Sequence, residues 1–155
     1  MARENLRPLL LLEDSAAAQF SEINKKNPNC VVIGLAPHLF HYDKLNEAFQ
    51  LAKSGGRIIA VNKSRQTIHL ISKYREILYL INRYFKKGSD LVLGTGAFVA
   101  GLEYSCDCKA EIVGKPSESF FSIAVSRFSN IDANEVMMVG DDIRDDVIGE
   151  LKIFK

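Results

Sequence analysis

Short apolar runs separated by turns recur along the first sixty residues of the chain. Leu, Val and Ile are frequent in three of these runs, at residues 8–14, 30–35 and 57–62. This composition is typical of buried parallel strands. Residues 42–53 carry apolar side chains at helical spacing, and Gly55-Gly56 follows as a stop signal. A shorter helix is predicted from Asp14 to Phe20. Strands that alternate with helices predict βαβ units and a parallel sheet, so the fold class is α/β.

The second half of the chain starts the pattern again. Gly94-Thr95-Gly96 opens a predicted helix that runs to about Tyr104. An apolar segment at 111–113 leads to Gly-Lys-Pro, a helix follows from Ser117, and residues 136–139 form another apolar run. Phe120, Ile123, Ala124 and Phe128 are the apolar positions of that helix. We therefore predict a boundary near Glu111, with one lobe at 1–111 and another at 112–155.

Residues 66–82 depart from this alternation. They contain neither Gly nor Pro, and Leu70, Tyr74, Leu78 and Ile81 fall on one helical stripe. We interpret the segment as an extra helix that packs on a core rather than as a membrane anchor.

Charge and cysteine usage narrow the class of protein. The formal net charge of +1 gives no reason to expect nucleic acid or an anionic membrane as a partner. Three cysteines without framework spacing favour a reducing compartment. The leucine run at 9–12 is too short for a signal peptide or a membrane span. The sequence alone predicts a cytoplasmic protein.

An acidic cluster follows the last apolar run. Asp141, Asp142, Asp145 and Asp146 surround the single Arg144, which leaves a local charge of about −3 that favours a nearby cation. Carboxylate oxygens of this kind suit Mg²⁺. The cluster would lie at the carboxyl end of a strand, where α/β sheets bind ligands.

Lys115 follows the apolar segment at 111–113, which is the predicted strand before the one that ends in the acidic cluster. One helix joins the two, and a right-handed crossover would bring Lys115 and Asp141 to the same sheet edge. A lysine and a metal ion there would bind a phosphoryl group. The alternative is structural: Asp145 and Asp146 favour a helix N-terminus, and Lys115 is a solvated turn residue.

Three other signals are read as structural. Gly94-Thr95-Gly96 lacks the third glycine of a dinucleotide fingerprint and is interpreted as a turn that opens a helix. His38 and His41 follow Pro37 and are assigned a capping or core role in preference to a zinc site. Cys106 and Cys108 are interpreted as ordinary thiols.

Two stretches of the second lobe resemble the third and fourth motifs of the haloacid dehalogenase-like hydrolases: residues 113–116 (VGKP) and 139–146 (VGDDIRDD). The first lobe is similar to the α/β cap of the branch that contains phosphoglycolate and pyridoxal phosphate phosphatases. The resemblance implies an α/β cap followed by part of a Rossmann-like core.

The resemblance also implies chemistry. Family members attack phosphorus with an aspartate, and a second aspartate two residues later acts as general acid/base. The lysine orients the nucleophile, the acidic motif holds Mg²⁺, and cap residues shape the choice of a small phosphorylated metabolite. The cap would also provide a surface for homo-oligomers. The candidate residues are Lys115 for catalysis, Asp141, Asp142 and Asp146 for the metal, and Asn62, Gly94, Thr95 and Gly96 for substrate.

Several parts of the family pattern are absent from these 155 residues. No two of the nine aspartates are spaced i, i+2, so the Asp-x-Asp-x-Thr nucleophile motif is missing. The Ser/Thr phosphate-binding motif is missing too, residues 66–82 have no counterpart, and the chain ends nine residues after Asp146. We expect a truncated, marginally stable and inactive phosphatase with an insertion. Two alternatives remain open: a non-catalytic interaction or dimerisation module, and an aberrant transcript product without a selected function.

Overall fold

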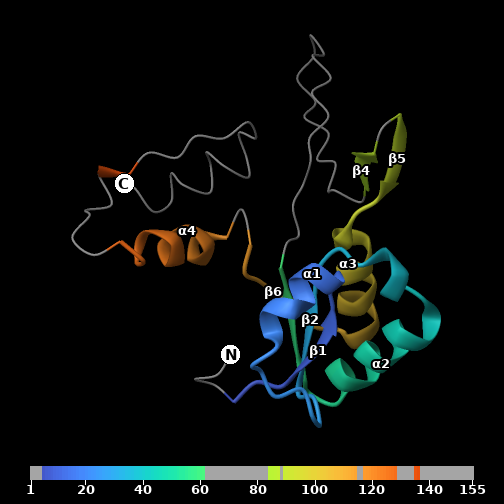
Figure 1. Ribbon diagram of the computed structural model, residues 1–155. Coiled ribbons are helices and arrows are strands. Elements are labelled where there is room, and N and C mark those ends of the chain that lie inside the picture. The colour runs from blue at the N-terminus through green and yellow to red at the C-terminus, as the bar shows by residue number, and fades with distance from the viewer. Residues whose placement is uncertain (1–4, 62–83, 88, 115–116, 129–134, 137–155) are drawn as a thin grey trace.

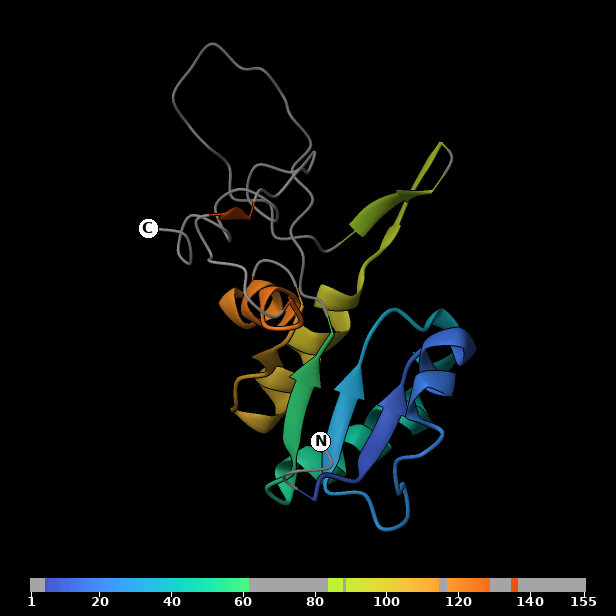
Figure 2. The ribbon, with the colours of Figure 1, turned by 60° about the vertical axis from the view of Figure 1, so that its left-hand side comes forward.

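Four parallel strands form the central sheet of the protein (Figures 1 and 2). The computed structural model describes residues 5–61, 84–87, 89–114, 117–128 and 135–136. Within them the strand order is β1-β2-β3-β6. The predicted α/β class with a parallel sheet is confirmed. The strands are β1 (Pro8–Leu11), β2 (Cys30–Ile33), β3 (Arg57–Ala60) and β6 (Glu111–Ile112).

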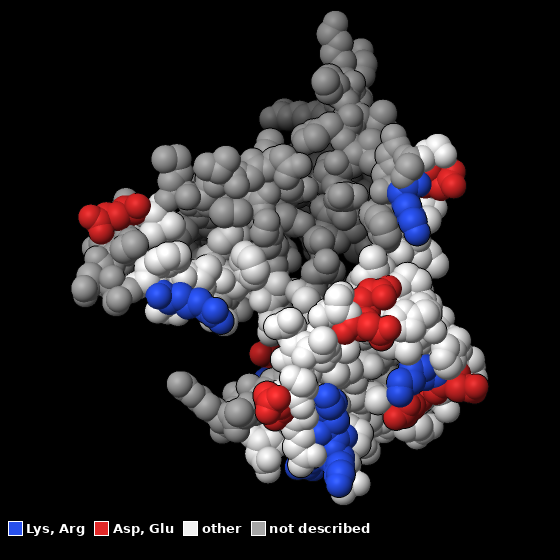
Figure 3. Space-filling view, viewed as in Figure 1, with Lys and Arg blue, Asp and Glu red and all other residues white. Residues whose placement is uncertain are grey.

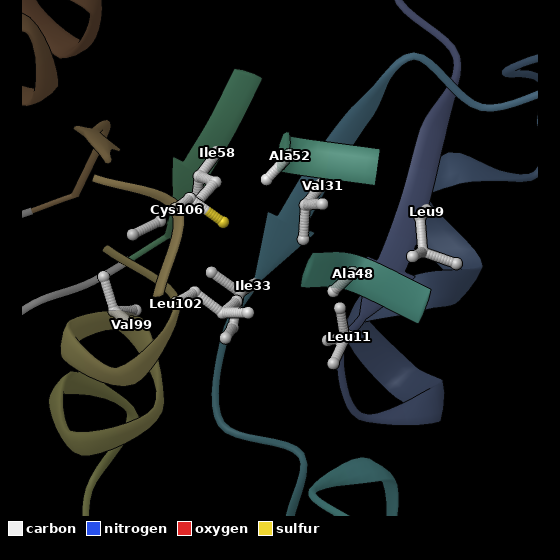
Figure 4. Close-up of a cluster of buried hydrophobic side chains, with 11 residues drawn as sticks. Leu9, Leu11, Val31, Ile33, Ala48, Ala52, Ile58, Val99, Leu102 and Cys106 are labelled. Carbon is white, nitrogen blue, oxygen red and sulfur yellow. The ribbon is translucent and has the colours of Figure 1, made fainter. Parts of the chain in front are cut away.

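Alternate side chains of the strands face opposite sides of the sheet, as the two-residue period of a strand requires. On one side, Val31 and Ile33 of the inner strand β2 are fully buried. Two helices cover this side: α2 (Tyr42–Lys53) and α3 (Thr95–Cys106). Figure 4 shows the small side chains Ala48 and Ala52 of α2 directed at the strands, which lets the helix approach the sheet closely.

The end of α2 confirms the stop predicted from the glycine pair. Gly55 has φ +98°, a conformation open to glycine because it has no Cβ. The Gly56 N–H donates to the Leu51 carbonyl (3.0 Å), and the Gly55 N–H donates to the Ala52 carbonyl (3.0 Å). These two bonds form a Schellman motif, which satisfies carbonyls left without partners at the helix end.

The opposite side of the sheet has a lighter cover. Cys30 and Val32 are buried there, and Phe20 packs against them from the short segment that follows β1. That segment consists of α1 (Asp14–Ala17) and the 3-10 helix η2 (Ala18–Phe20), so the helix predicted from Asp14 to Phe20 is confirmed with a tighter last turn. The strand predicted over 8–14 ends earlier, because Glu13 already accepts the first helical hydrogen bonds.

An antiparallel hairpin was not predicted. It pairs β4 (Tyr84–Lys87) with β5 (Asp90–Leu93), with Lys87 opposite Asp90. This register leaves the two-residue sequence Gly88-Ser89 between the strands, and Gly followed by a small polar residue is a hairpin signal. The hairpin projects away from the sheet (Figures 1 and 2), and Leu91 and Leu93 are about 60% exposed.

The strand on which the predicted lobe boundary falls is part of the central sheet. Residues Glu111 and Ile112 pair with Ile59 and Ala60 of β3. The division into lobes at this point stays a prediction. Beyond it, α4 (Glu118–Val125) begins after Ser117, as predicted.

The apolar positions predicted for α4 are not its buried ones. Phe121 is buried, whereas Ile123 and Phe128 are more than half exposed and Phe120 is 37% exposed. Among the described residues, no helix is long and apolar enough to cross a bilayer. The predicted helix at 66–82 and the strand at 136–139 lie largely or wholly outside the described residues.

Candidate functional site

The Gly94-Thr95-Gly96 segment begins α3 at the carboxyl edge of the sheet. A helix that leads into a parallel strand runs antiparallel to it, so α3 starts at the edge where β1, β2 and β3 end. Gly94 is the N-cap residue with extended φ and ψ (−88°, 167°), and its carbonyl accepts the Ala97 N–H (3.2 Å). Thr95 is 4% exposed. The interpretation of this segment as a helix-opening turn is confirmed.

Packing against a neighbouring loop holds this segment in place. The ring of Phe98, one turn into α3, stacks on Phe40, with centroids 3.9 Å apart and planes at 23°. Phe40 follows the 3-10 helix η3 (Pro37–Leu39), which comes after β2. The stack therefore ties the start of α3 to the loop at the carboxyl end of β2. The sequence did not predict this pair, because Phe40 and Phe98 are far apart in the chain and belong to different elements.

Two neighbouring strands, β3 and β6, end shortly before two further candidates, Asn62 and Lys115. Val61 directly precedes Asn62, and Gly114 directly precedes Lys115. The Val113 N–H donates to the Ala60 carbonyl (3.0 Å), which continues the parallel ladder of β3 and β6 to this edge. The positions that lead into Asn62 and Lys115 thus lie side by side at the carboxyl ends of adjacent strands.

Most of the candidate residues themselves fall outside the described part of the chain. This holds for Asn62, Lys115, Asp141, Asp142 and Asp146. Within the described residues, no three His, Cys, Asp or Glu side chains are grouped to hold a metal ion. The catalytic and metal assignments therefore stay predictions.

The two histidines do not have the roles assigned to them. Both are exposed, and His41 occupies the N-cap position of α2 without a side-chain capping bond. His38 Nδ1 lies 3.7 Å from a carboxylate oxygen of Glu13, which follows β1. No acid stands beside His38 in the sequence, so only the fold reveals this pair.

The cysteines are free thiols, as predicted. Burial raises the pKa of the Cys30 thiol, and it raises the pKa of Cys106 with a smaller contribution from the neighbouring Cys108. Cys106 Sγ lies 3.8 Å from the Phe49 carbonyl and donates to it. Because a raised pKa lowers the thiolate fraction, neither buried thiol is an activated nucleophile.

A buried carboxylate binds the backbone of the segment that leads into β6. Glu103, on α3, is 8% exposed, and its Oε1 accepts the Ala110 N–H (3.0 Å). This bond connects the last turn of α3 to the segment that leads into Glu111. Glu103 therefore has a structural role in positioning the strand that ends before Lys115.

Comparison with known proteins shows which family the chain resembles. A family model described as HAD-hyrolase-like matches residues 112–151. The haloacid dehalogenase-like hydrolase domain-containing protein 2 of Mus musculus is 41% identical over 151 residues, which are 97% of this chain and 51% of the relative. The human phospholysine phosphohistidine inorganic pyrophosphate phosphatase is 36% identical over 96% of this chain and 49% of its own length. The chain spans about half the length of the curated relatives it matches.

Solved structures share the fold. A p-nitrophenyl phosphatase from Archaeoglobus fulgidus superimposes with a TM-score of 0.76 at 22% identity, covering 98% of this chain and 54% of the other. NagD from E. coli K-12 gives a TM-score of 0.72 at 21% identity, covering 96% and 52%. The solved structures show that the fold is shared, and the family model and the sequence relatives assign the chain to the haloacid dehalogenase-like hydrolase superfamily.

Proposed function

We propose that the chain carries the cap and the lysine and metal-binding motifs of a Mg²⁺-dependent phosphomonoesterase, and that these 155 residues alone do not hydrolyse phosphate esters. One observation carries the first part. The ladder between β3 and β6 brings the residues before Asn62 and Lys115 to the same sheet edge at which α3 begins. A cap residue and the family lysine would then share one site with the start of α3.

In this proposal Lys115 neutralises phosphoryl oxygens, and Asp141 binds the metal with support from Asp142 and Asp146. The donor set fits the ion, because hard carboxylate oxygens suit Mg²⁺. Bound Mg²⁺ would supply charge stabilisation for the phosphoryl group. Asn62 and the Gly94-Thr95-Gly96 segment would contact a small phosphorylated metabolite.

The missing nucleophile supports the second part. Phosphate monoesters hydrolyse so slowly without catalysis that enzymes accelerate the reaction by up to ~10²¹-fold. Covalent catalysis and the metal act together to reach such rates. The sequence has a lysine and acids in the family spacing but no Asp-x-Asp-x-Thr segment. We therefore expect no turnover above that of buffer with Mg²⁺.

The test is an assay of the 155-residue chain with p-nitrophenyl phosphate and Mg²⁺, alongside Asp141→Asn. Turnover that Asp141→Asn abolishes would show that the chain is active. Metal binding is measured separately by the Mg²⁺-dependent rise in melting temperature, because a ligand that binds only the folded state stabilises it. Asp141→Asn should lose this rise, whereas Asp90→Asn, on the exposed hairpin, should keep it.

A second candidate function is a non-catalytic interaction module. The observation that favours it is the solvent side of α3, whose exposed side chains are uncharged. Mixing the chain with a full-length relative tests this function, and a hybrid complex in size-exclusion chromatography is the expected result.

A further inference from the structure

Two of the three thiols lie together at the end of α3. Cys106 is the last residue of the helix, Asp107 follows as its cap, and Cys108 comes next. Cys106 is buried, whereas Cys108 is only partly buried. The third thiol, Cys30, belongs to the apolar cluster on the opposite side of the sheet. The end of α3 therefore combines one covered thiol with one that solvent reaches.

The backbone after α3 turns Cys108 back toward the helix. Asp107 has φ 53° and ψ 45°, a left-handed conformation that few residues other than glycine adopt. The Cys108 N–H donates to the Glu103 carbonyl (3.2 Å), which fixes this turn as part of the helix ending. Two residues of extended chain span about 7 Å, which is about the largest Cα separation that a disulfide bridges. The turn brings the Cα atoms of Cys106 and Cys108 closer than an extended chain would.

The two thiols also contact each other. The pKa of Cys106 is raised mainly by burial, and the neighbouring Cys108 adds to this through its charge and through a hydrogen bond between the two side chains. Cys106 is a member of the apolar cluster between the helices and the sheet, and Cys108 packs against the same cluster. The two sulfur atoms are therefore already neighbours in the reduced protein.

Helix α2 holds the Cys106 thiol by a weak bond. Its Sγ donates to the Phe49 carbonyl at 3.8 Å, and a thiol is a weak donor. The ion pair of α2, between Lys44 Nζ and a Glu47 carboxylate oxygen at 2.6 Å, lies on the solvent side. Figure 3 shows neighbouring acidic and basic side chains there, at the lower right over α2. Moving the Cys106 sulfur toward Cys108 thus costs the fold one weak hydrogen bond.

Cys108 is open to a small reagent. It lines a hollow of about 850 Å³ together with Tyr104, Asp107 and Lys109. Cys106 is not among the residues that line this hollow in the described part of the chain. A reagent from solvent therefore meets the sulfur of Cys108 first.

We propose that Cys106 and Cys108 form a reversible redox site, in which a hydroperoxide converts the two thiols into an intramolecular disulfide. The Cys108 thiolate attacks the terminal oxygen of the hydroperoxide ROOH, and the O–O bond breaks. Cys108 becomes a sulfenic acid, and the leaving RO⁻ takes up the thiol proton to give ROH. Cys106 then attacks the Cys108 sulfur, the S–S bond forms, and the S–O bond breaks to release water. The thiols lose two electrons and two protons in total, and ROOH is reduced to ROH and water.

Proximity makes Cys106 an effective partner in the second step. A raised pKa lowers the thiolate fraction of Cys106, but a group held in contact reacts at a far higher effective concentration than a free thiol. The disulfide then forms before more hydroperoxide oxidises Cys108 irreversibly to a sulfinic acid. In a reducing compartment such a disulfide is transient, as redox-sensing disulfides are. The site lies at the opposite end of α3 from Gly94, so it does not depend on the proposed phosphatase site.

The test is mass spectrometry of the full 155-residue chain after treatment with hydrogen peroxide. Trypsin yields one peptide, 88–109, that holds both Cys106 and Cys108, and another, 27–44, that holds Cys30. The first peptide should lose the mass of two hydrogen atoms, and the second should keep its free thiol. Reduced glutathione should restore both thiols of the first peptide.

Two variants test the order of the steps. Cys106→Ser removes the second thiol, so Cys108 should reach the sulfinic acid at least about tenfold faster than in the wild-type chain. Cys108→Ser should leave Cys106 reduced, because Cys106 does not line the hollow. The matched control is Cys30→Ser, which changes another buried thiol and should leave the disulfide unchanged. Circular dichroism checks that each variant is folded.

Four outcomes would overturn the proposal. The first is a wild-type chain that keeps three free thiols after treatment. The second is oxygen added to Cys108 in place of the disulfide, and the third is a disulfide between two chains. The fourth is a disulfide that reduced glutathione does not open, which would remove the reversibility.

Discussion

Replacing Ile33 by alanine tests whether the α2–α3 side of the sheet is the main core. Ile33 lies on an inner strand, is 0% exposed, and faces both helices (Figure 4). The change removes three carbons at about 0.8 kcal/mol each, or about 2.4 kcal/mol of transfer free energy. The cavity left behind adds to this, so the loss should reach about 2.5–4 kcal/mol.

Urea unfolding followed by circular dichroism measures the loss, with two comparison variants. Ile33→Val removes one carbon and should cost about 0.5–1.5 kcal/mol. Leu91→Ala removes as many carbons as Ile33→Ala, but Leu91 is 59% exposed on the hairpin, and its loss should stay well under that of Ile33→Ala. Equal losses for Ile33→Ala and Leu91→Ala would refute the assignment of the core.

Three further outcomes follow from local features. Gly55→Ala should lower the free energy of unfolding by about 1 kcal/mol, because φ is +98° there; thermal melts measure this, and an unchanged melting temperature would contradict the Schellman ending of α2. At neutral pH, iodoacetamide should modify Cys108 before the buried Cys30 and Cys106 thiols. Burial raises the pKa of these two thiols in the folded state, so the stability that they contribute when protonated is present below the ordinary thiol pKa of about 8.5 and is lost as the pH rises through the raised values. The urea midpoint should therefore fall over that alkaline range. Glu111→Gln removes a half-exposed ion pair with Arg57 and should cost under about 1 kcal/mol, less at high salt; a larger loss would mean that the pair is shielded from solvent.

The sequence predicted the central sheet well because its signals are local. The strands have continuous apolar runs, and α2 has apolar spacing and a glycine stop, so its observed bounds are those predicted. The hairpin was not predicted, because its turn signal, Gly88-Ser89, follows closely on a long segment whose sequence pattern is helical. In α4 the spacing marked Phe120 and Ile123, but burial selected Phe121, since tertiary contacts decide which side of a short apolar helix is covered.

Less of the candidate site than of the sheet could be predicted from the sequence. The helix-opening role of Gly94-Thr95-Gly96 follows from glycine chemistry and was confirmed. The Phe40–Phe98 stack and the Glu13–His38 pair join residues far apart in the chain, and such contacts leave no periodic signal. The proximity of the positions before Asn62 and Lys115 depends on which strands pair, which a single sequence specifies only through topology rules.

The projecting hairpin sets how different parts of this protein open. Strands β4 and β5 form a two-stranded sheet in which Leu91 and Leu93 are mostly exposed, and an isolated two-stranded hairpin is marginally stable in water, whereas β2 is paired on both sides and buried along its length. Amide hydrogens of β4 and β5 should therefore exchange with solvent deuterium through local opening, while those of β2 wait for global unfolding. The chain would then contain a fast-exchanging arm joined directly to α3, and a ligand that binds this arm would be detected as slower exchange of the β4 and β5 amides.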